Sequence, residues 1–417
     1  MLEQPRFGQR LKELRRMRGL SQAALVGDGI STGYLSRLES GARPPTERVV
    51  TYLAKRLDVD LSAFDMPPSG TTLAQALSIA ASAECEEAMD ALLDCLDRTD
   101  RTDCTDPLLR WQALWMVARR WNKRGDKTRE LVCLEELSRI ADELGLPELR
   151  CRAWVSLARC LRSTGEVNRA IKVASCAVRI AKESRLSVSD TGAALMVLVS
   201  AEAEEGRLPD ARAHVDELIE LIEPIGDRNG TLKAEALWSA ATVRFRQGDQ
   251  QAAGEYLERA IDGLDSYSDL TLWIRLRLAA ASLSLQSAPP RTGTAAERLK
   301  EAESALAFAC TPLLAQELLT LKAHLAFEDQ RFTDARALLD ELHQDELLLT
   351  YRDRIRLGVL DARLLITEGR LRNGLQQLKE LGEEAHRACN VDLSAEIWRI
   401  LAEALEHTHG PLDSAGS

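Results

Sequence analysis

The first informative absence in this 417-residue sequence is that of a membrane or export signal. No apolar run reaches about eighteen residues, the length that indicates a membrane-spanning helix. The start of the chain also lacks the charged segment followed by an apolar segment that marks a secretory leader. We therefore expect a cytoplasmic protein that does not associate with membranes.

Cysteine occurs nine times but forms no C-x-x-C pair. The number is odd, and most of the nine fall where a helix would take a small apolar residue. Disulfide frameworks and zinc sites need even sets or fixed close spacings, whereas isolated core cysteines behave as small apolar residues. We predict free thiols in the core, and neither disulfides nor a zinc site.

Sequence patterns of common enzymes are absent as well. The six histidines form no H-E-x-x-H motif or metal-spaced cluster, and there is no P-loop, no G-x-G-x-x-G after a strand and no G-x-S-x-G. Adjacent acids such as Glu204 and Glu205 fit the solvated face of an amphipathic helix. The sequence therefore predicts a protein that is not an enzyme and that needs no cofactor or metal.

Charge is unevenly distributed along the chain, whose net charge is −11. Residues 1–65 carry eleven Lys and Arg against eight Asp and Glu, a net charge of +3, and the remainder carries −14. Six basic residues lie close together near the start, with Glu13 as the only acid among them: Arg6, Arg10, Lys12, Arg15, Arg16 and Arg18. Such a run is usually a solvated face, but it also fits a nucleic-acid partner.

The spacing of apolar residues divides this N-terminal segment into five short helices. The first ends at Gly19, which suits a left-handed cap, and the second starts at Gln22 and stops at the glycines that follow. Ser31 can cap the third helix, which ends at Gly41. The fourth follows two prolines, and a fifth near residues 61–64 closes the core.

The second and third of these helices have the arrangement of a helix-turn-helix. On the third helix the leucines face inward, and a small polar face points outward: Thr32, Gly33, Ser36 and Arg37. A helix that enters the major groove needs short polar or arginine side chains at its N-terminal end to reach the base edges. The free N–H groups there suit a phosphate. The sequence predicts a DNA-binding domain; the alternative is a small helical bundle that binds no nucleic acid.

The segments LSQAAL, STGYLSRLESG and RPP resemble the Cro/repressor-type (XRE) helix-turn-helix domain, over about residues 6–65. The resemblance implies a double-stranded DNA operator contacted by Gln22, Ser31, Thr32, Gly33, Ser36, Arg37 and Arg43. Gln22 and Arg43 would bind the phosphate backbone, and Arg37 would lie near the bases with Thr32 and Gly33. Glu39 resembles the acid that pairs within the domain. The segment between Gln22 and Ser31 is one residue shorter than the commonest pattern, and the tilt of the third helix depends on it.

The rest of the chain indicates a linker followed by helix pairs. Turn residues recur at intervals of 39 to 42 residues, one interval being doubled, with a small residue seven positions before each: Gly125, Gly165, Gly206, Gly248, Gln330 and Gly369. This spacing predicts about eight helix pairs and a capping helix. The segments that we assign are a DNA-binding domain at 1–65, a linker at 66–72, repeats at 73–406 and a disordered tail at 407–417.

The repeat around Gly165 resembles the tetratricopeptide repeat, because Trp154, Leu157, Ala158 and Leu161 stand at that family's spacing. The resemblance implies a right-handed superhelix with a concave groove, lined by the first helix of each pair. Such grooves bind extended peptides or partner helices. The side chains that we place in the groove as effector contacts are Arg119, Asn122, Arg159, Arg162, Trp238, Thr242, Phe245, His324 and Arg363.

An XRE-type domain followed by such repeats resembles bacterial regulators that sense short signalling peptides. We expect an all-α protein with an N-terminal five-helix helix-turn-helix domain and a superhelical, tetratricopeptide-like α-solenoid. The resemblance implies a homodimeric transcription regulator whose repeats bind a peptide or protein effector that modulates operator binding. Two alternatives remain: a scaffold whose repeats hold a protein partner and whose head localises it, and a regulator whose acidic repeats contact polymerase without any ligand.

Overall fold

Helices form nearly all of the regular structure in the computed structural model, which describes residues 4, 6–27, 29–64, 72–82, 85–98, 106–224 and 230–409. In these residues the only strand-like pairing is an isolated bridge between Gly27 and Ile30. The predicted all-α class is therefore confirmed. The chain forms two compact units, Met1–Ala113 and Leu114–Ser417, with the division inside one helix.

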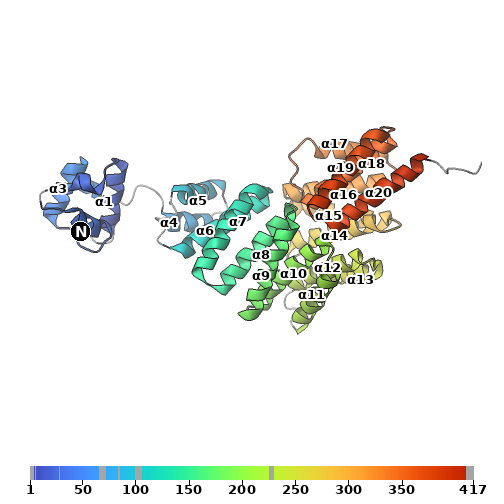
Figure 1. The fold of residues 1–417 in the computed structure, drawn as a ribbon, viewed down its shortest axis with the longest axis horizontal. Helices are drawn as coiled ribbons and strands as arrows, with labels where there is room; N and C mark the ends of the chain where they lie inside the picture. The colour runs from blue at the N-terminus through green and yellow to red at the C-terminus, as the bar shows by residue number, and fades with distance from the viewer. Residues whose placement is uncertain are drawn as a thin grey trace, which may run out of the picture. The chain divides into compact units, whose positions relative to one another are not determined.

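The first unit begins with five short helices (Figure 1). They are α1 (Arg6–Met17), η1 (Gln22–Leu25), α2 (Thr32–Glu39), α3 (Glu47–Leu57) and η2 (Leu61–Phe64). Their core contains Phe7, Leu11, Leu35, Leu38 and Leu53, each at most 1% exposed. The second element is a single turn of 3₁₀ helix, because the chain is already extended at Val26 and too few residues remain to propagate an α-helix.

Helix pairs make up the remainder of the described chain. The pairs are α4 (Leu73–Ser82) with α5 (Glu86–Arg98), α6 (Pro107–Arg124) with α7 (Lys127–Leu144), α8 (Pro147–Ser163) with α9 (Val167–Glu183), α10 (Val188–Glu205) with α11 (Leu208–Ile222), α12 (Gly230–Arg246) with α13 (Gln250–Asp262), α14 (Leu270–Gln286) with α15 (Thr292–Ala309), α16 (Pro312–Glu328) with α17 (Phe332–Leu342), and α18 (Tyr351–Thr367) with α19 (Leu371–Arg387). A final helix, α20 (Val391–His409), extends three residues into the predicted tail. The predicted linker, except Thr72, and the tail from residue 410 lie outside the described residues.

The turns within six of the pairs have the left-handed backbone that a glycine adopts at low cost. The φ angles are 77° at Gly125, 88° at Gly165, 87° at Gly206, 84° at Gly248, 61° at Gln330 and 84° at Gly369. All six turn positions predicted from the repeat spacing are thus confirmed. Gln330 is the exception in residue type, and its positive φ carries a modest strain.

Helix α10 shows why the middle of the second unit folds as it does. Its sequence is apolar on nearly every side, from Ala194 and Leu195 to Val199 and Ala203, and all four are at most 1% exposed. A helix that is hydrophobic all round is buried, and α10 packs against α8, α9, α11 and α12. The apolar sequence of α10 therefore explains why this helix is buried among four neighbouring helices.

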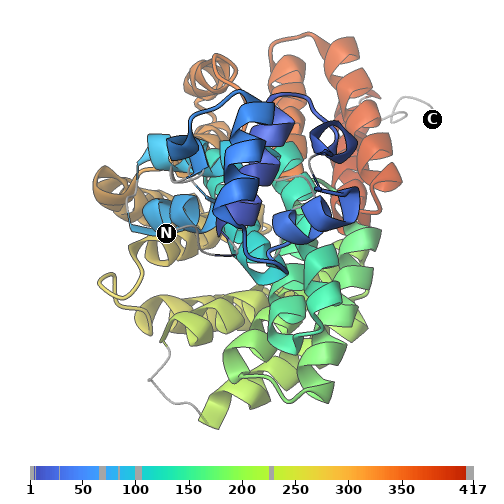
Figure 2. The same cartoon turned by 90° about the vertical axis from the view of Figure 1, so that its left-hand side faces the viewer.

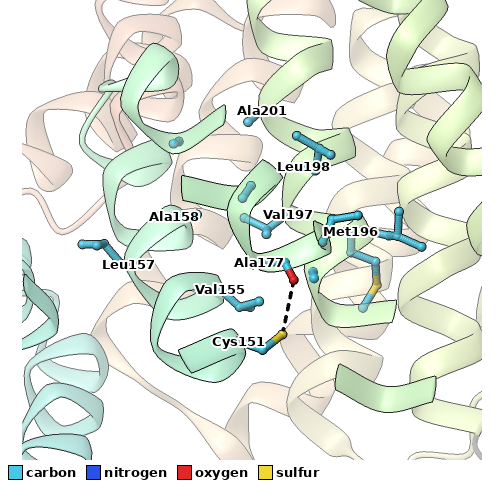
Figure 3. Close-up of a cluster of buried hydrophobic side chains, with 14 of the residues drawn as sticks. Cys151, Val155, Leu157, Ala158, Ala177, Met196, Val197, Leu198 and Ala201 are labelled. Atoms are coloured by element: carbon cyan, nitrogen blue, oxygen red, sulfur yellow. Dashed lines mark hydrogen bonds between the residues drawn. The ribbon is translucent and has the colours of Figure 1, made fainter. Parts of the chain in front are cut away.

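The core between α8, α9 and α10 consists largely of small side chains (Figure 3). Ala158, Ala177 and Ala201 are fully buried and let the helices approach closely. The Sγ atom of Cys151 lies 3.8 Å from the carbonyl oxygen of Ala177. Burial raises the pKa of this thiol to about 11, so it stays protonated and unreactive near neutral pH.

The cysteine prediction is confirmed in part. The eight cysteines in the described residues are free. Cys95, Cys151 and Cys160 are buried as predicted, whereas Cys85 and Cys310 are exposed. Both exposed cysteines lie just outside a helix, Cys85 before α5 and Cys310 at the C-cap of α15. The periodic pattern that predicts a buried helix face does not apply at these positions.

Within the second unit the last helices return to the early repeats. Helix α20 packs on α10 and α18 on α8, and the red C-terminal helices lie beside the green repeats in Figures 1 and 2. A Cβ added at Gly165 would lie 2.9 Å from the ring of Tyr351, and one at Gly206 would lie 3.3 Å from Val391. The turns of these repeats therefore form the surface on which α18 and α20 pack.

Buried ion pairs join the same helices. Arg352 of α18 is 2.8 Å from Asp392 of α20, which is also 3.4 Å from Arg246 of α12. Arg162 of α8 is 2.7 Å from Glu204 of α10. Separating the helices would leave each of these charges largely buried without its opposite charge, which is unfavourable. The pairs therefore hold the helices together. The inner face of the repeats is bounded by early and late helices together.

Candidate nucleic-acid interface and ligand groove

Helix α2 presents the small polar face that its sequence predicts. Leu35 and Leu38 are buried, and the four outward residues are exposed: Thr32, Gly33, Ser36 and Arg37. The Oγ of Ser31 accepts a hydrogen bond from the backbone N–H of Tyr34 at 3.2 Å, which caps the helix. The exposed N-terminal turn therefore offers short side chains and backbone N–H groups, the surface that a base edge or phosphate requires.

Glu39 at the end of α2 organises the helix-turn-helix from inside. Its carboxylate accepts hydrogen bonds from Arg15 Nε at 2.6 Å, from Arg15 Nη2 at 2.9 Å and from Gln22 Nε2 at 2.8 Å. The hydrogen bonds that Arg15 donates to Glu39 raise the pKa of Arg15. The predicted intradomain role of Glu39 is confirmed, and Gln22 keeps only its second amide hydrogen for a phosphate.

The basic run on α1 is less a DNA surface than its charge suggests. Arg10 is 6% exposed, and its Nε donates to the carbonyl oxygen of Ala63 at 2.9 Å. Arg18 Nη2 donates to the carbonyl oxygen of Asp58 at 2.8 Å. With Arg15 on Glu39, at least three of the six basic residues connect α1, or the residue just after it, to other elements of the domain. A charge count along the sequence does not reveal these partners.

Arg37 and Arg43 are the exposed arginines beside the outward face of α2. Arg37 Nε donates to the carbonyl oxygen of Gly33 at 3.1 Å, one turn back along the helix. The guanidinium of Arg43 lies 4.4 Å from the ring centroid of Tyr34, a cation–π contact. Both arginines are thus held near the helix while remaining open to solvent.

In the second unit the first helices of the pairs form the inner layer. Helix α8 contacts α10, α10 contacts α12, α12 contacts α14, α14 contacts α16 and α16 contacts α18. Among the described residues no second helix has a comparable contact with the next second helix. Helices on the inside of a curved array lie closer together, so the first helices line the concave face. All nine predicted groove residues lie on first helices.

Several of the predicted groove residues are already engaged within the protein. Arg162 pairs with Glu204, and Arg363 pairs with Glu328 at 2.8 Å and stacks on Phe327. Asn122 Nδ2 donates to Glu130 at 2.8 Å, and Thr242 Oγ1 donates to the carbonyl oxygen of Trp238 at 3.0 Å. Trp238 also packs against the core of α12–α14. Phe245 lines a hollow between α12, α13 and α14.

Three of the ionisable residues predicted for the groove have no ion-pair partner among the described residues: Arg119, Arg159 and His324. Arg159 is exposed, yet the surrounding protein lowers its pKa, and Glu235 opposes that shift. A side chain that water can reach but that is surrounded by protein atoms is typical of a concave surface. Burial and the neighbouring Arg356 and Arg363 lower the pKa of His324 to about 4, so it is neutral at pH 7. Arg119 is exposed and has no ion pair with the described residues.

Sequence reasoning missed three charged residues of the same face: Glu235, Arg275 and Glu317. With Arg159 they make no ion pair and no side-chain hydrogen bond within the described part of the chain. Glu235 lies thirteen residues before Gly248, and Glu317 lies thirteen before Gln330. A search at thirteen residues before each predicted turn, seven before the position that contains Arg159, would have found Glu235 and Glu317. Arg275 follows from the repeat spacing, because it lies 40 residues after Glu235 and 42 before Glu317.

Comparisons with known proteins identify two kinds of domain in the chain. Residues 6–65 match the model of a helix-turn-helix domain, and residues 190–266 match that of the tetratricopeptide repeat. No curated protein matches the sequence significantly. Among the described residues no helix is long and apolar enough to cross a membrane, and no cluster of potential ligands could hold a metal ion.

Two solved structures share the fold over nearly the whole chain. One is the Rap conjugation gene regulator of the plasmid pLS20 in complex with the Phr* peptide, 14% identical, with a TM-score of 0.54. It covers 96% of this chain and 98% of its own. The other is a Rap protein complexed with competence and sporulation factor, 10% identical, with a TM-score of 0.53, covering 97% and 98%. The chain thus combines a helix-turn-helix domain with a Rap-like solenoid of tetratricopeptide type.

Proposed function

We propose that this protein is a sequence-specific DNA-binding transcription regulator, and not an enzyme. The observation that carries the proposal is the exposed, capped start of α2, where Thr32, Gly33, Ser36 and Arg37 share one open face. Glu39 and Arg15 hold this helix against α1, so the face is presented by a rigid element. Small side chains on such a helix allow the backbone to approach the floor of the major groove.

We further propose that the repeat domain binds a short peptide as its effector. Of the two Rap structures with the same fold, one is a complex with the Phr* peptide and the other a complex with competence and sporulation factor. In this chain the inner face has charged side chains that no described residue neutralises, which is the kind of surface that binds polar groups of an extended peptide. The net charge of −14 beyond residue 65 argues against DNA as the partner of this face.

In the proposed mechanism two copies of the chain bind a two-part operator. A dimer places its two recognition helices about one helical turn of DNA, or a multiple of it, apart. A peptide that binds one arrangement of the repeats better than another would shift the population between them and so change the spacing of the heads. The operator should then be palindromic, and the peptide should alter affinity without touching DNA.

Genome-wide capture of fragmented DNA by the purified full-length protein tests the proposal. We expect enriched fragments to share one palindromic motif, and we expect Arg37→Ala to lose that enrichment. Capture of fragments without a shared motif, at equal efficiency for both proteins, would reject sequence-specific regulation. Light scattering on the same preparation measures the dimer directly, and a stable protein partner with no DNA motif would favour the scaffold alternative.

A further inference from the structure

The unpaired charges of the inner face follow the repeat register. Glu235 on α12, Arg275 on α14 and Glu317 on α16 occupy equivalent positions, because Arg275 lies 40 residues after Glu235 and 42 before Glu317. Helix α12 contacts α14, and α14 contacts α16. The three side chains therefore form a row across neighbouring helices in which acid, base and acid alternate. We call these three residues with Arg159 the charge row.

Arg159 extends the charge row from the far side of α10. Its charge and that of Glu235 are close enough to affect each other's pKa. Between α8 and α12 lies α10, whose residues at the two equivalent positions are Ala193 and Ser200. Because both side chains are small, α10 contributes no charge there and leaves space above it.

The charge row differs from three other arginines of the same face in being unpaired. Arg162, Arg356 and Arg363 each have an acid within 3.2 Å. The members of the charge row have no such partner in the described chain, although the surrounding protein raises the pKa of Glu235 and lowers that of Arg159. Desolvating a charge without a partner is unfavourable, and groups kept in that state are frequent at binding sites.

The two ends of the charge row have opposite signs. Arg159 has a second arginine, Arg162, as its neighbour, whose charge helps to lower the pKa of Arg159. Glu317 at the opposite end faces Asp353 of α18, a further acid that makes its ionisation harder. One end therefore favours an anionic group and the other a cationic group. The arrangement has a direction, from positive at α8 to negative at α16 and α18.

We propose that the charge row binds an extended peptide by its two free termini, with the carboxylate at Arg159 and the ammonium group at Glu317. The inference rests on the proposed function, because it specifies which peptides the repeats accept and in which direction they lie. Between the termini, Arg275 and Glu235 can donate to and accept from the peptide backbone. Longer segments of folded proteins, which lack one or both free ends at this spacing, would be excluded.

The test uses synthetic heptapeptides of randomised sequence in four forms: free at both ends, acetylated at the N-terminus, amidated at the C-terminus, and blocked at both. Each pool is passed over immobilised full-length protein, and retained peptides are quantified by mass spectrometry. Loss of one charge-assisted contact corresponds to about tenfold to a hundredfold in affinity. We expect either block to reduce retention by at least about tenfold, the lower end of that range.

Charge-neutral variants assign each terminus to its residue. Arg159→Gln should lower retention of free peptides and remove the further effect of amidation, while acetylation still acts. Glu317→Gln should remove the effect of acetylation, while amidation still acts. The matched controls are Arg372→Gln and Glu220→Gln on the second helices α19 and α11, where both residues are exposed; they should behave as the unchanged protein.

The possible outcomes distinguish failure of the charge row as a terminus site from failure of peptide binding itself. Retention that is equal for all four forms would overturn the charge row as a terminus site and leave peptide binding intact. Blocks that act equally on the unchanged protein and on both variants would place the termini elsewhere and also overturn it. No retention of any pool by a protein that still binds its operator would reject both the inference and the peptide effector. If Arg159→Gln removed the effect of acetylation and Glu317→Gln removed that of amidation, the peptide would lie in the opposite direction, which would contradict the proposal.

Discussion

The N-terminal domain and the repeat domain use arginine in opposite ways. In the head, Arg10 and Arg15 belong to a conspicuous basic run, yet they bind a carbonyl oxygen and Glu39 inside the domain. In the repeats, Arg159 and Arg275 belong to no run, yet they lack partners in the described chain on a concave face. The comparison teaches that the pairing of a charge, more than its density along the sequence, distinguishes arginines that join structural elements from arginines left open to a ligand.

The largest effect should come from removing the acid at the centre of the head. Glu39→Ala leaves the guanidinium of Arg15, which is 11% exposed, without its carboxylate. Breaking one partner of a buried ion pair costs about 3 to 5 kcal/mol. Hydrogen exchange of α1 and α2 in the full-length protein should accelerate accordingly. Asp60→Ala, at an exposed residue of the same domain, is the control; equal exchange in both variants would show that Arg15 and Glu39 are dispensable.

A pair of arginines three residues apart sharpens the comparison within the repeats. Arg162→Ala would leave Glu204, whose side chain is 2% exposed, with no cation closer than Arg246 at 4.0 Å. We expect a loss of about 2 to 3 kcal/mol in unfolding free energy, less than for a fully buried pair because Arg162 is 34% exposed.

Arg159→Ala should leave stability unchanged or raise it slightly, since it removes a desolvated charge without a partner. Chemical denaturation of both variants measures the difference. If the two variants lose equal stability, the assignment of Arg162 to structure and of Arg159 to binding is wrong. Retention of free heptapeptides should show the reverse order, with Arg159→Ala the weaker binder.

The two exposed arginines of the head should differ in what they read. Arg37→Ala should weaken operator binding by about 1 to 3 kcal/mol, with little effect on random DNA, because base contacts specify sequence. Arg43→Ala should weaken binding to both DNAs and flatten the salt dependence, because a phosphate contact releases a counterion whatever the sequence. Titrations with operator and scrambled duplexes at several salt concentrations measure both effects. An unchanged preference for the operator in Arg37→Ala would assign base reading to other residues of α2.

The sequence predicted features that depend on neighbours along the chain. The cap at Ser31, the left-handed turns from Gly125 to Gly369 and the helix pairs between them follow from local propensity and a fixed period. These features correctly predict which side of α2 is exposed and that the groove residues lie on the first helices of the pairs, because a register of seven residues keeps side chains on one side of a helix.

Pairing between distant elements could not be predicted in the same way. Arg162 meets Glu204, 42 residues further along, and the turns at Gly165 and Gly206 are packed by α18 and α20. Periodicity in the sequence predicts which side chains share a helix face. Which charges from distant repeats come within ion-pair distance depends on the curvature of the repeat array. For that reason the sequence grouped Arg159 with Arg162, although only one of them has an ion-pair partner in the described residues.

The smallest predicted effect is a pH dependence in which two groups of the inner face oppose each other. Burial raises the pKa of Glu317 from its ordinary 4.5 to about 7, with Asp353 adding to the shift and Arg275 opposing it. The folded protein then keeps a proton that the unfolded chain releases, so this contribution to stability is present below pH 4.5 and is lost as pH rises to about 7. Burial lowers the pKa of His324 from 6.5 to about 4, so its contribution is present above pH 6.5 and is lost as pH falls towards 4.

Between pH 4.5 and 6.5, the ordinary values for Glu317 and His324, the two slopes therefore have opposite signs and largely cancel. Removing one should reveal the other. Glu317→Gln should make the melting temperature rise with pH across this window, and His324→Gln should make it fall, each relative to the unchanged protein. Thermal melts at fixed ionic strength in both variants and the double variant measure the slopes. Parallel curves for all four proteins would show that neither side chain is held in its unusual protonation state, and would remove the desolvation argument for the negative end of the charge row.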